Sequence, residues 1–177
     1  MKKQFLIFFF VFINLNSSGQ YFKWAKNFGG PYDDFLYTST IDKSNNILST
    51  GYYNRYADFD PDNSASYTLN SQGAEDIYIS KLDNNGKFIW AKSIGSSASE
   101  IGYDIITDKA GNVYVTGTFT GTVDFDPGTS VFNLTSGGTS DKDIFISKFD
   151  SIGNFIWAKS IGSTDFDEGY SIVIDSI

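Results

Sequence analysis

The 177-residue sequence contains no cysteine and no histidine. Without cysteine there is no disulfide framework, so burial and strand pairing must stabilise the fold. Without histidine the commonest general base and the commonest transition-metal ligand are missing, which excludes catalytic triads and zinc sites built on that residue. Arg55 is the only arginine and no basic stripe occurs, so nucleic acid is a poor candidate partner.

Residues that favour helices are also scarce. Methionine occurs once, and alanine, leucine and glutamate are sparse, whereas 18% of the residues are aromatic and 17 are glycine. This composition favours strands and turns. The hydrophobic content of 41% is enough for a packed core. The composition therefore predicts an all-β protein.

The first 19 residues have the pattern of a secretory signal peptide. Two lysines precede an apolar run over residues 5–13, and Ser17 and Gly19 occupy the −3 and −1 positions of a cleavage site before Gln20. A membrane anchor would need ~20 apolar residues, and this run has about nine. We expect a secreted or cell-surface protein of bacterial type, without a membrane span after cleavage. Loss of the two lysines takes the formal charge from −8 to −10.

A nine-residue stretch occurs three times. Residues 154–162 (NFIWAKSIG) repeat residues 87–95 (KFIWAKSIG) and, less closely, residues 21–29 (YFKWAKNFG). The repeat markers are one tryptophan and one glycine in each copy: Trp24, Trp90 and Trp157, and Gly29, Gly95 and Gly162. A repeat this long predicts an array of supersecondary units, each too small to bury its own faces.

Each full period predicts four antiparallel strands joined by tight, glycine-containing turns. In the second unit these strands are expected at residues 102–108, 112–120, 143–150 and 154–162. A longer loop separates the middle two strands and contains a candidate short hairpin. The same sequence positions predict an equivalent loop in the first unit.

The strands carry apolar or β-branched residues on both faces. Alternation places Val113 and Val115 on one face of their strand, and Tyr114 and Thr116 on the other. In the last strand, alternation places Phe155, Trp157 and Ile161 on a shared face. Strands that are apolar on both sides are typical of sheets sandwiched between neighbouring sheets. Radial repetition of four-stranded antiparallel sheets is a β-propeller.

The repeats predict a division of the chain in order. A signal peptide (1–19) precedes a β-propeller repeat region (20–177), which consists of a lone fourth strand (21–29), two full blades (30–95 and 96–162) and a partial blade (163–177). Such a chain holds about 2.4 units, and a closed ring needs roughly four to eight blades. Two explanations stay open. The chain is a fragment of a larger protein, or it closes its ring by oligomerising.

These motifs resemble the SBBP-type β-propeller repeat, in the long form found in secreted proteins of Bacteroidetes-like bacteria. The resemblance covers residues 21–177 and rests on the W-A-K-x-x-G strand, the D-x-x-G-N-V-Y-V-T-G hairpin (108–117), the V-D-F-D-P-G loop (123–128) and the D-I-F-I-S-K-F-D strand (143–150). It implies a secreted or cell-surface propeller, often within a longer protein that has a C-terminal sorting domain. It implies no established activity. The first hairpin departs from the pattern, since residues 42–51 read DKSNNILSTG.

One loop has the carboxylate spacing of a calcium site. Asp58, Asp60 and Asp62 follow the D-x-D-x-D pattern that opens a calcium loop. The loop lacks the glycine and the glutamate that an EF-hand carries at positions six and twelve, and the second copy keeps only Asp124 and Asp126. Aspartate followed by proline is also ordinary turn chemistry. The sequence therefore favours turns, with Ca²⁺ as the alternative and no other cofactor.

The three tryptophans and the loop carboxylates suggest two further functions. Exposed tryptophans could stack against sugars, but their recurrence on an apolar alternation favours packing between blades. Carboxylates before the first strand of each unit could hydrolyse glycosides as acid and base or nucleophile; they are Asp33, Asp34, Glu100, Asp165, Asp167 and Glu168. Because an enzyme needs one asymmetric centre, a carboxylate in every unit argues for a repeated turn.

The sequence thus predicts no catalytic residue and favours a non-catalytic binding or scaffold module. The expected partner is an unknown protein or glycan, together with the remaining blades of a longer chain or other copies of this one. A carbohydrate-binding, lectin-like propeller is the first alternative. A polysaccharide-degrading enzyme, a glycoside hydrolase or lyase, is the second.

Overall fold

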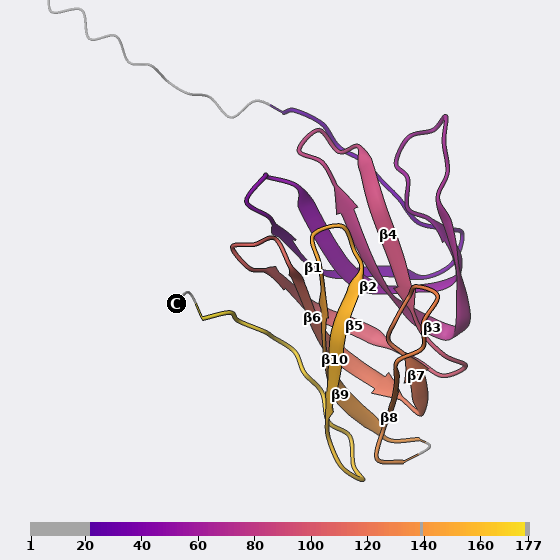
Figure 1. Ribbon diagram of the computed structural model, residues 1–177. Coiled ribbons are helices and arrows are strands. Elements are labelled where there is room, and N and C mark those ends of the chain that lie inside the picture. The colour runs from indigo at the N-terminus through magenta and orange to yellow at the C-terminus, as the bar shows by residue number, and fades with distance from the viewer. Residues whose placement is uncertain (1–21, 139, 176–177) are drawn as a thin grey trace, which may run out of the picture.

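The computed structural model describes residues 22–138 and 140–175, in which strands and turns occur without any helix. The predicted all-β class is confirmed (Figure 1). The first sheet has the order β1-β2-β3-β4 and the second the order β10-β9-β6-β5. The strands of the first sheet are β1 (Asp34–Ile41), β2 (Ile47–Asp58), β3 (Thr68–Leu82) and β4 (Phe88–Ile94). Those of the second are β5 (Ile101–Thr107), β6 (Val113–Thr120), β9 (Lys142–Phe149) and β10 (Phe155–Ile161).

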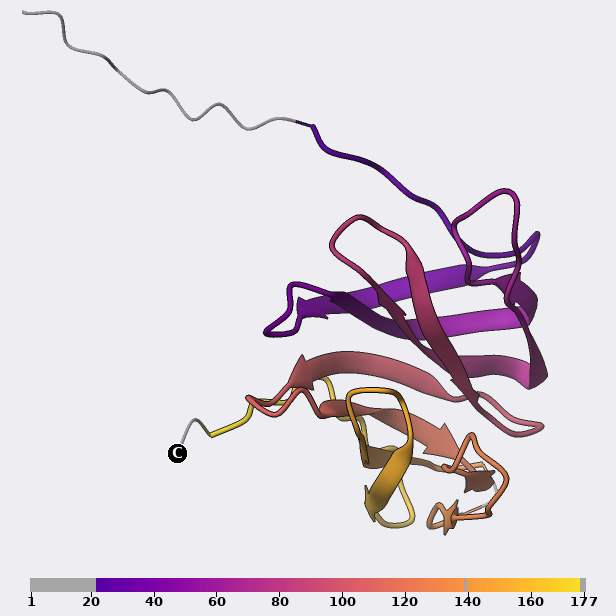
Figure 2. The ribbon, with the colours of Figure 1, turned by 45° about the horizontal axis from the view of Figure 1, so that its top comes forward.

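Both sheets are open, four-stranded and antiparallel, as expected of incomplete propeller blades. They lie face to face, and Figure 2 shows one stacked on the other. β5 is the strand of the second sheet that packs most closely on the first, against β1 and β2. The two blades therefore meet along their first strands, which form the inner side of a propeller.

The hairpin turns share one aspartate arrangement. In each, the Oδ1 atom of Asp42, Asp83, Asp108 or Asp150 accepts hydrogen bonds from the backbone N–H groups two and four residues later, over 2.7–3.0 Å. The residue three positions after the aspartate has a positive φ. It is glycine in three turns and Asn45, with φ of 60°, in the first. Asparagine tolerates this left-handed conformation, so the divergent first hairpin keeps the same turn.

The loop between the second and third strands differs between the blades. In the second blade it contains the predicted short hairpin, β7 (Thr122–Asp124) paired with β8 (Asn133–Thr135). In the first blade the equivalent residues extend β2 and β3, which pair as far as Asp58 and Thr68. A residue of each loop enters the core, because Phe59 and Phe125 are fully buried.

The main core fills the space between the two sheets. It joins the leading face of the first sheet to the trailing face of the second sheet. The leading face of a sheet is the one that points toward the following unit, and the trailing face is the one that points toward the preceding unit. The leading face comprises Leu48, Ile77, Ile79, Trp90 and Ile94; the trailing face comprises Ile105, Val113, Val115, Phe119, Val123, Phe125, Phe145, Phe149 and Ala158. Thr116 and Thr118, on the other face of β6, are also buried. The predicted packing of sheet on sheet is therefore observed on one face of each sheet, and no sheet in the described residues is covered by a neighbouring sheet on both faces.

The predicted shared face of Phe155 and Trp157 is wrong. The β9–β10 register shifts between these two residues, which marks a β-bulge. A bulge adds one residue to the strand and breaks the two-residue alternation. As a result Phe155 packs against the core that contains Ala158, whereas the Trp157 ring lies 6.2 Å from the Tyr114 ring on the opposite face.

The segments before the first sheet and after the second sheet are not part of either sheet. Residues 22–29, predicted as a strand, form a single bridge between Gly29 and Asp58. Residues 170–175, within the predicted partial blade 163–177 and at the place of its first strand, have no strand assignment. In each case the described residues contain no neighbouring strand that could complete the ladder, since those neighbours would belong to other blades. Residues 1–19, predicted as a signal peptide, lie outside the described residues.

Candidate functional site

The repeated tryptophans pack between units. A β-carbon added at Gly153 would lie 3.1 Å from Trp90 Cδ2, and one added at Gly86 would lie 3.2 Å from Trp24 Cε3. Each tryptophan thus lies beneath the last hairpin turn of the following unit. Trp90 is only 9% exposed, and the Trp24 indole N–H donates to the Asn84 carbonyl over 3.2 Å. These contacts explain the tryptophan repeat by packing, as the alternation favours.

The leading face of the second sheet has the equivalent residues, but they are less buried than those of the first sheet. Its members are Tyr114, Ile144, Ile146, Trp157 and Ile161, each one repeat period after its counterpart in the first sheet. All five are half-buried or exposed. The isoleucine at the end of the face changes most, from 1% exposed at Ile94 to 56% at Ile161. This leading face therefore remains partly open, whereas its counterpart in the first sheet is buried.

Each sheet has an equivalent lysine–aspartate ion pair, and the pair of the first sheet is more buried than that of the second. In the first sheet Lys81 Nζ lies 2.9 Å from Asp42 Oδ2, and both side chains are 5% exposed. Lys81 Nζ also donates to the Ser151 carbonyl in the second blade. In the second sheet Lys148 Nζ lies 4.0 Å from Asp108 Oδ2, and the side chains are 20% and 19% exposed. Burial opposes ionisation of Asp42, but hydrogen bonds from Asn46 and Lys81 lower its pKa to about 2.

The loop carboxylates that a glycosidase alternative would use close the same loop in successive units. Asp34, Glu100 and Asp167 each accept a hydrogen bond from the backbone N–H four residues earlier, at 2.6, 2.7 and 3.0 Å. Asp33 and Asp165 are exposed beside them. The structure therefore separates these groups, one set to a unit, and does not bring them together in one centre.

Glu100 is the most strongly perturbed of these groups. Its side chain is fully buried between the blades, where Ser96 Oγ and the Ser96 N–H both donate to it. Burial and the nearby Asp76 carboxylate raise its pKa to about 7, although the Ser96 hydrogen bonds act in the opposite direction. This carboxyl group is therefore poised to gain or lose a proton near neutral pH.

We predict a pH-dependent stability difference between the parent and a Glu100→Gln variant. Below pH 4.5, the ordinary pKa of the group, the carboxyl is protonated in folded and unfolded protein and has no effect. Between pH 4.5 and about 7 the unfolded chain loses this proton while the folded chain keeps it. The parent should therefore lose up to about 3 kcal/mol relative to the variant across this window. Urea titrations at several pH values measure the difference, and a constant difference would contradict the assignment.

The calcium candidates bond to the backbone of their own loops. Asp58 Oδ1 accepts from the N–H groups of Asp60 and Tyr67, at 3.0 and 2.8 Å. The second loop repeats this arrangement around Asp124 and Asp126. Within the described part of the chain, no three acidic, histidine or cysteine residues form a group that could hold a metal ion. The geometry is that of successive aspartate-capped turns.

These turns lead to a prediction about calcium. Because Asp60 Oδ1 accepts from the Asp62 N–H over 3.0 Å, and an asparagine oxygen can replace it, the Asp60→Asn variant should unfold at the parent's temperature. EDTA and millimolar Ca²⁺ should also give the same unfolding temperature for both proteins. Thermal unfolding followed by circular dichroism tests this. A Ca²⁺-dependent increase in the parent that disappears in the variant would establish a calcium site instead.

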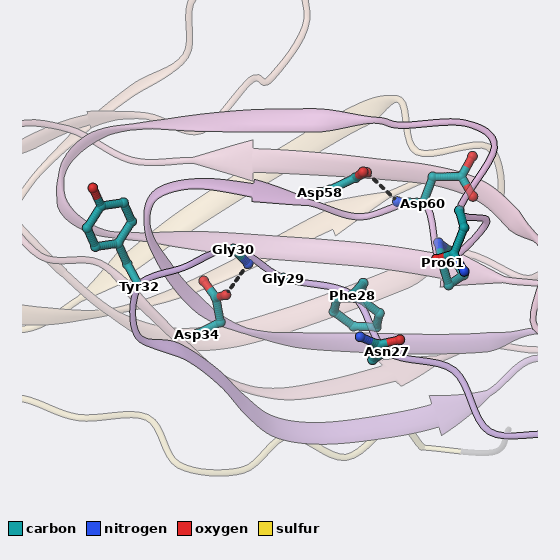
Figure 3. A pocket seen from close by; sticks show the side chains of 10 residues that line it. Asn27, Phe28, Gly29, Gly30, Tyr32, Asp34, Asp58, Asp60 and Pro61 are labelled. Carbon is teal, nitrogen blue, oxygen red and sulfur yellow. Dashed lines mark hydrogen bonds between the residues drawn. The ribbon is translucent and has the colours of Figure 1, made fainter.

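A cavity of about 430 Å³ lies where residues 27–34 cross the first of these loops. Figure 3 shows Asp34 and Asp58 on its walls, with their bonds to Gly30 and Asp60. Asp34 Oδ1 is buried and has no hydrogen-bond partner within the described residues. The Tyr32 ring forms another wall, and the Arg55 guanidinium lies 4.7 Å from its centre. Carboxylate, amide and aromatic groups together suit a small polar ligand.

Sequence reasoning missed a column of tyrosines along the first strands. Tyr37, Tyr103 and Tyr170 occupy the same position in three successive units. Their ring centres are 4.9 Å apart at both steps. The period could have revealed them, since each follows the loop carboxylate by three residues, but nothing in the sequence indicates that the rings touch.

Comparisons with known proteins agree with the repeat architecture. Residues 89–121 match the SBBP β-propeller repeat, which confirms the resemblance there. This stretch comprises most of β4 with β5 and β6, so the sequence repeat bridges two sheets. The chain is also 30% identical over 148 residues to the uncharacterized WD repeat-containing protein L264 of Acanthamoeba polyphaga mimivirus. The match covers 78% of this chain and 10% of that relative. In the described residues, no helix is long and apolar enough to cross a membrane.

Proposed function

We propose that this β-propeller repeat chain is a non-catalytic binding and scaffold module, exported to the cell surface or beyond. The observation that carries the proposal is that each unit uses its carboxylates to bind its own backbone. Asp34, Glu100 and Asp167 close one loop, and Asp58 and Asp124 close another. Loops fixed in this way present variable side chains on a rigid frame, which suits recognition better than acid–base chemistry.

Export is tested by the N-terminus of the mature protein. In bacteria that secrete through signal peptidase, the purified protein should begin at Gln20 and be accessible to protease added to intact cells. A protein that retains residues 1–19 and resists the protease would remove the exported part of the proposal. The scaffold part would then be tested separately.

Absence of catalysis is tested on pooled polysaccharides. The parent and an Asp167→Asn variant should both release no reducing sugar and no unsaturated product. Asp167 is only partly buried, whereas Glu100 is fully buried, so a substrate in solution can reach it. Hydrolysis or elimination by the parent that the variant loses would replace this proposal with a glycosidase or lyase.

Carbohydrate binding is a second candidate, and the cavity beside Asp34 favours it. Tyr32 lines this cavity, and Asp34, Asp58 and Asn63 supply hydrogen-bonding groups on the same walls. The exposed ring of Tyr56 lies next to Tyr32, with ring centres 5.6 Å apart. Sugars are commonly held by an aromatic face together with carboxylate and amide groups. A glycan array with the parent and a Tyr32→Ala variant tests this. Binding that the variant loses supports a lectin, and absence of binding to a folded preparation removes it.

A further inference from the structure

The tyrosine column contains a pair that is arranged for oxidative coupling. The rings of Tyr103 and Tyr170 have centres 4.9 Å apart and an interplanar angle of 43°. Tyr103 lies on β5, and Tyr170 lies in the segment that follows the same course beside it, where the Ile172 N–H donates to Asp104 Oδ2 over 2.9 Å. The contact between the two rings therefore joins two successive units of the repeat.

The surroundings of the pair favour removal of an electron from Tyr170. This side chain is 64% exposed, so an oxidant in solution can reach it. Its hydroxyl donates a hydrogen bond to the Glu168 carboxylate. A phenol gives up an electron far more readily when its proton can move at the same time to a base, and the carboxylate is such a base. Glu168 is also within 3.8 Å of Lys142 Nζ, which helps to hold it in place.

Tyr103 is less readily oxidised than Tyr170. Its ring is half-buried, and its pKa is raised to about 12 by burial, by Glu168 and by Tyr37. It therefore stays protonated at neutral pH and is oxidised only by a close neighbour or a strong oxidant. A radical formed on Tyr170 has Tyr103 as its adjacent phenol, in contact across 4.9 Å.

We propose that Tyr103 and Tyr170 form an oxidative cross-linking site, at which a one-electron oxidant converts the pair to dityrosine. Each phenol loses one electron to the oxidant and one proton, from Tyr170 to Glu168 and from Tyr103 to water. The two radicals join through ring carbons beside their hydroxyl groups. The hydrogens on those carbons then move to the phenol oxygens and restore both aromatic rings. The product has lost two hydrogen atoms, and two equivalents of oxidant have been reduced.

Such a bond would link neighbouring units covalently in a chain that has no cysteine. It would close a long loop between β5 and the C-terminal segment, and closing a long loop lowers the entropy of the unfolded chain. The cross-linked protein should therefore unfold at a higher temperature than the parent. This inference does not depend on the proposed binding function, since it concerns the contact between units alone.

The experiment uses a photogenerated tris-bipyridine ruthenium(III) oxidant with persulfate on dilute purified protein. Dityrosine fluorescence should appear, and tryptic digestion should give one product that joins residues 93–109 to residues 160–177, which contain the two tyrosines. Tyr170→Phe should abolish this product, and Glu168→Gln should lower its rate of formation severalfold without removing it. Tyr37→Phe should leave it unchanged. An equal mixture of ¹⁵N-labelled and unlabelled protein should give no mixed-isotope product, because the reaction is intramolecular.

A second exposed pair within the same molecule provides the matched control. Tyr32 and Tyr56 have ring centres 5.6 Å apart at 84°. Their coupling would join residues 27–43 to residues 56–81, so digestion distinguishes it. Greater yield there, or at any other pair, would overturn the proposal. So would an equal yield of the product when the oxidation is carried out in about 8 M urea, which unfolds small domains, or a product of mixed isotope composition.

Discussion

Replacing Trp90 with alanine should lower the free energy of unfolding by about 3–5 kcal/mol, as for other large-to-small changes in a packed core. Trp90 is 9% exposed and lies between the two sheets. Its ring supports the Gly153 turn of the second blade, with a closest approach of 3.1 Å to a β-carbon placed there. Alanine would leave a cavity at the interface and remove that support.

Trp157 provides the matched control, since it holds the same position in the next unit. Its neighbour in the structure is Tyr114, with ring centres 6.2 Å apart, and it remains half-buried. Trp157→Ala should therefore cost about 1 kcal/mol or less, in the range of partly exposed substitutions. Chemical denaturation of both variants measures the two costs. Equal losses would contradict the view that the first interface is complete and the second is open.

Replacing Gly95 with alanine should be nearly as damaging, at about 3 kcal/mol or more, because overpacking and broken hydrogen bonds add. A β-carbon at this position would lie 2.1 Å from Asp76 Cγ. The Asp76 side chain is fully buried and accepts hydrogen bonds from the N–H groups of Gln72 and Gly73, so it cannot move aside. Gly162 has the same relation to Asp143, at 2.4 Å. The repeat marker glycine is therefore required by a carboxylate.

Gly121→Ala is the control for the loss of glycine alone. Gly121 has a φ of +72°, and a β-carbon there would meet no atom within 4 Å. The substitution should cost about 1 kcal/mol, as is usual for an alanine in the left-handed region. The two variants are compared by urea denaturation. A Gly95→Ala variant no less stable than Gly121→Ala would show that Asp76 does not hold that position.

The sequence period was sufficient to predict the all-β class, the four strands in each unit and the hairpin within the Asp124 loop. These follow from local alternation and turn residues, which the chain repeats. The bulge at Phe155 could not be predicted in this way, because a single extra residue in a strand leaves no mark on composition. The aspartate-closed turns at Asp42 and Asp108 were present in the repeated motif, but their hydrogen-bonding role became evident only from geometry.

Contacts between units were the least predictable feature. Trp90 meets Gly153, Lys81 meets Ser151, and Tyr103 meets Tyr170, and in each pair the two residues are far apart in the sequence. Recurrence of a residue indicates that its position matters, and it does not indicate which distant residue it touches. For the same reason the loop carboxylates could be recognised as repeated turns, whereas the burial of Glu100 between blades could not.

Each leading face should receive another unit of the same repeat, and adding one unit to the chain tests this directly. A second copy of residues 96–162 would be inserted between Gly162 and Ser163. The single thiol of an Ile161→Cys variant would report on the face, since the natural chain has no cysteine and Ile161 is 56% exposed. A thiol at Val131, which is 70% exposed in a loop, would serve as the control.

The measurement is the rate at which a maleimide modifies each thiol in the 177-residue chain and in the extended chain. The Ile161→Cys thiol should react at least about tenfold more slowly in the extended chain, because a buried group reacts only when the structure opens locally. The Val131→Cys thiol should react equally fast in both. Equal rates for Ile161→Cys in the two folded chains would contradict this expectation.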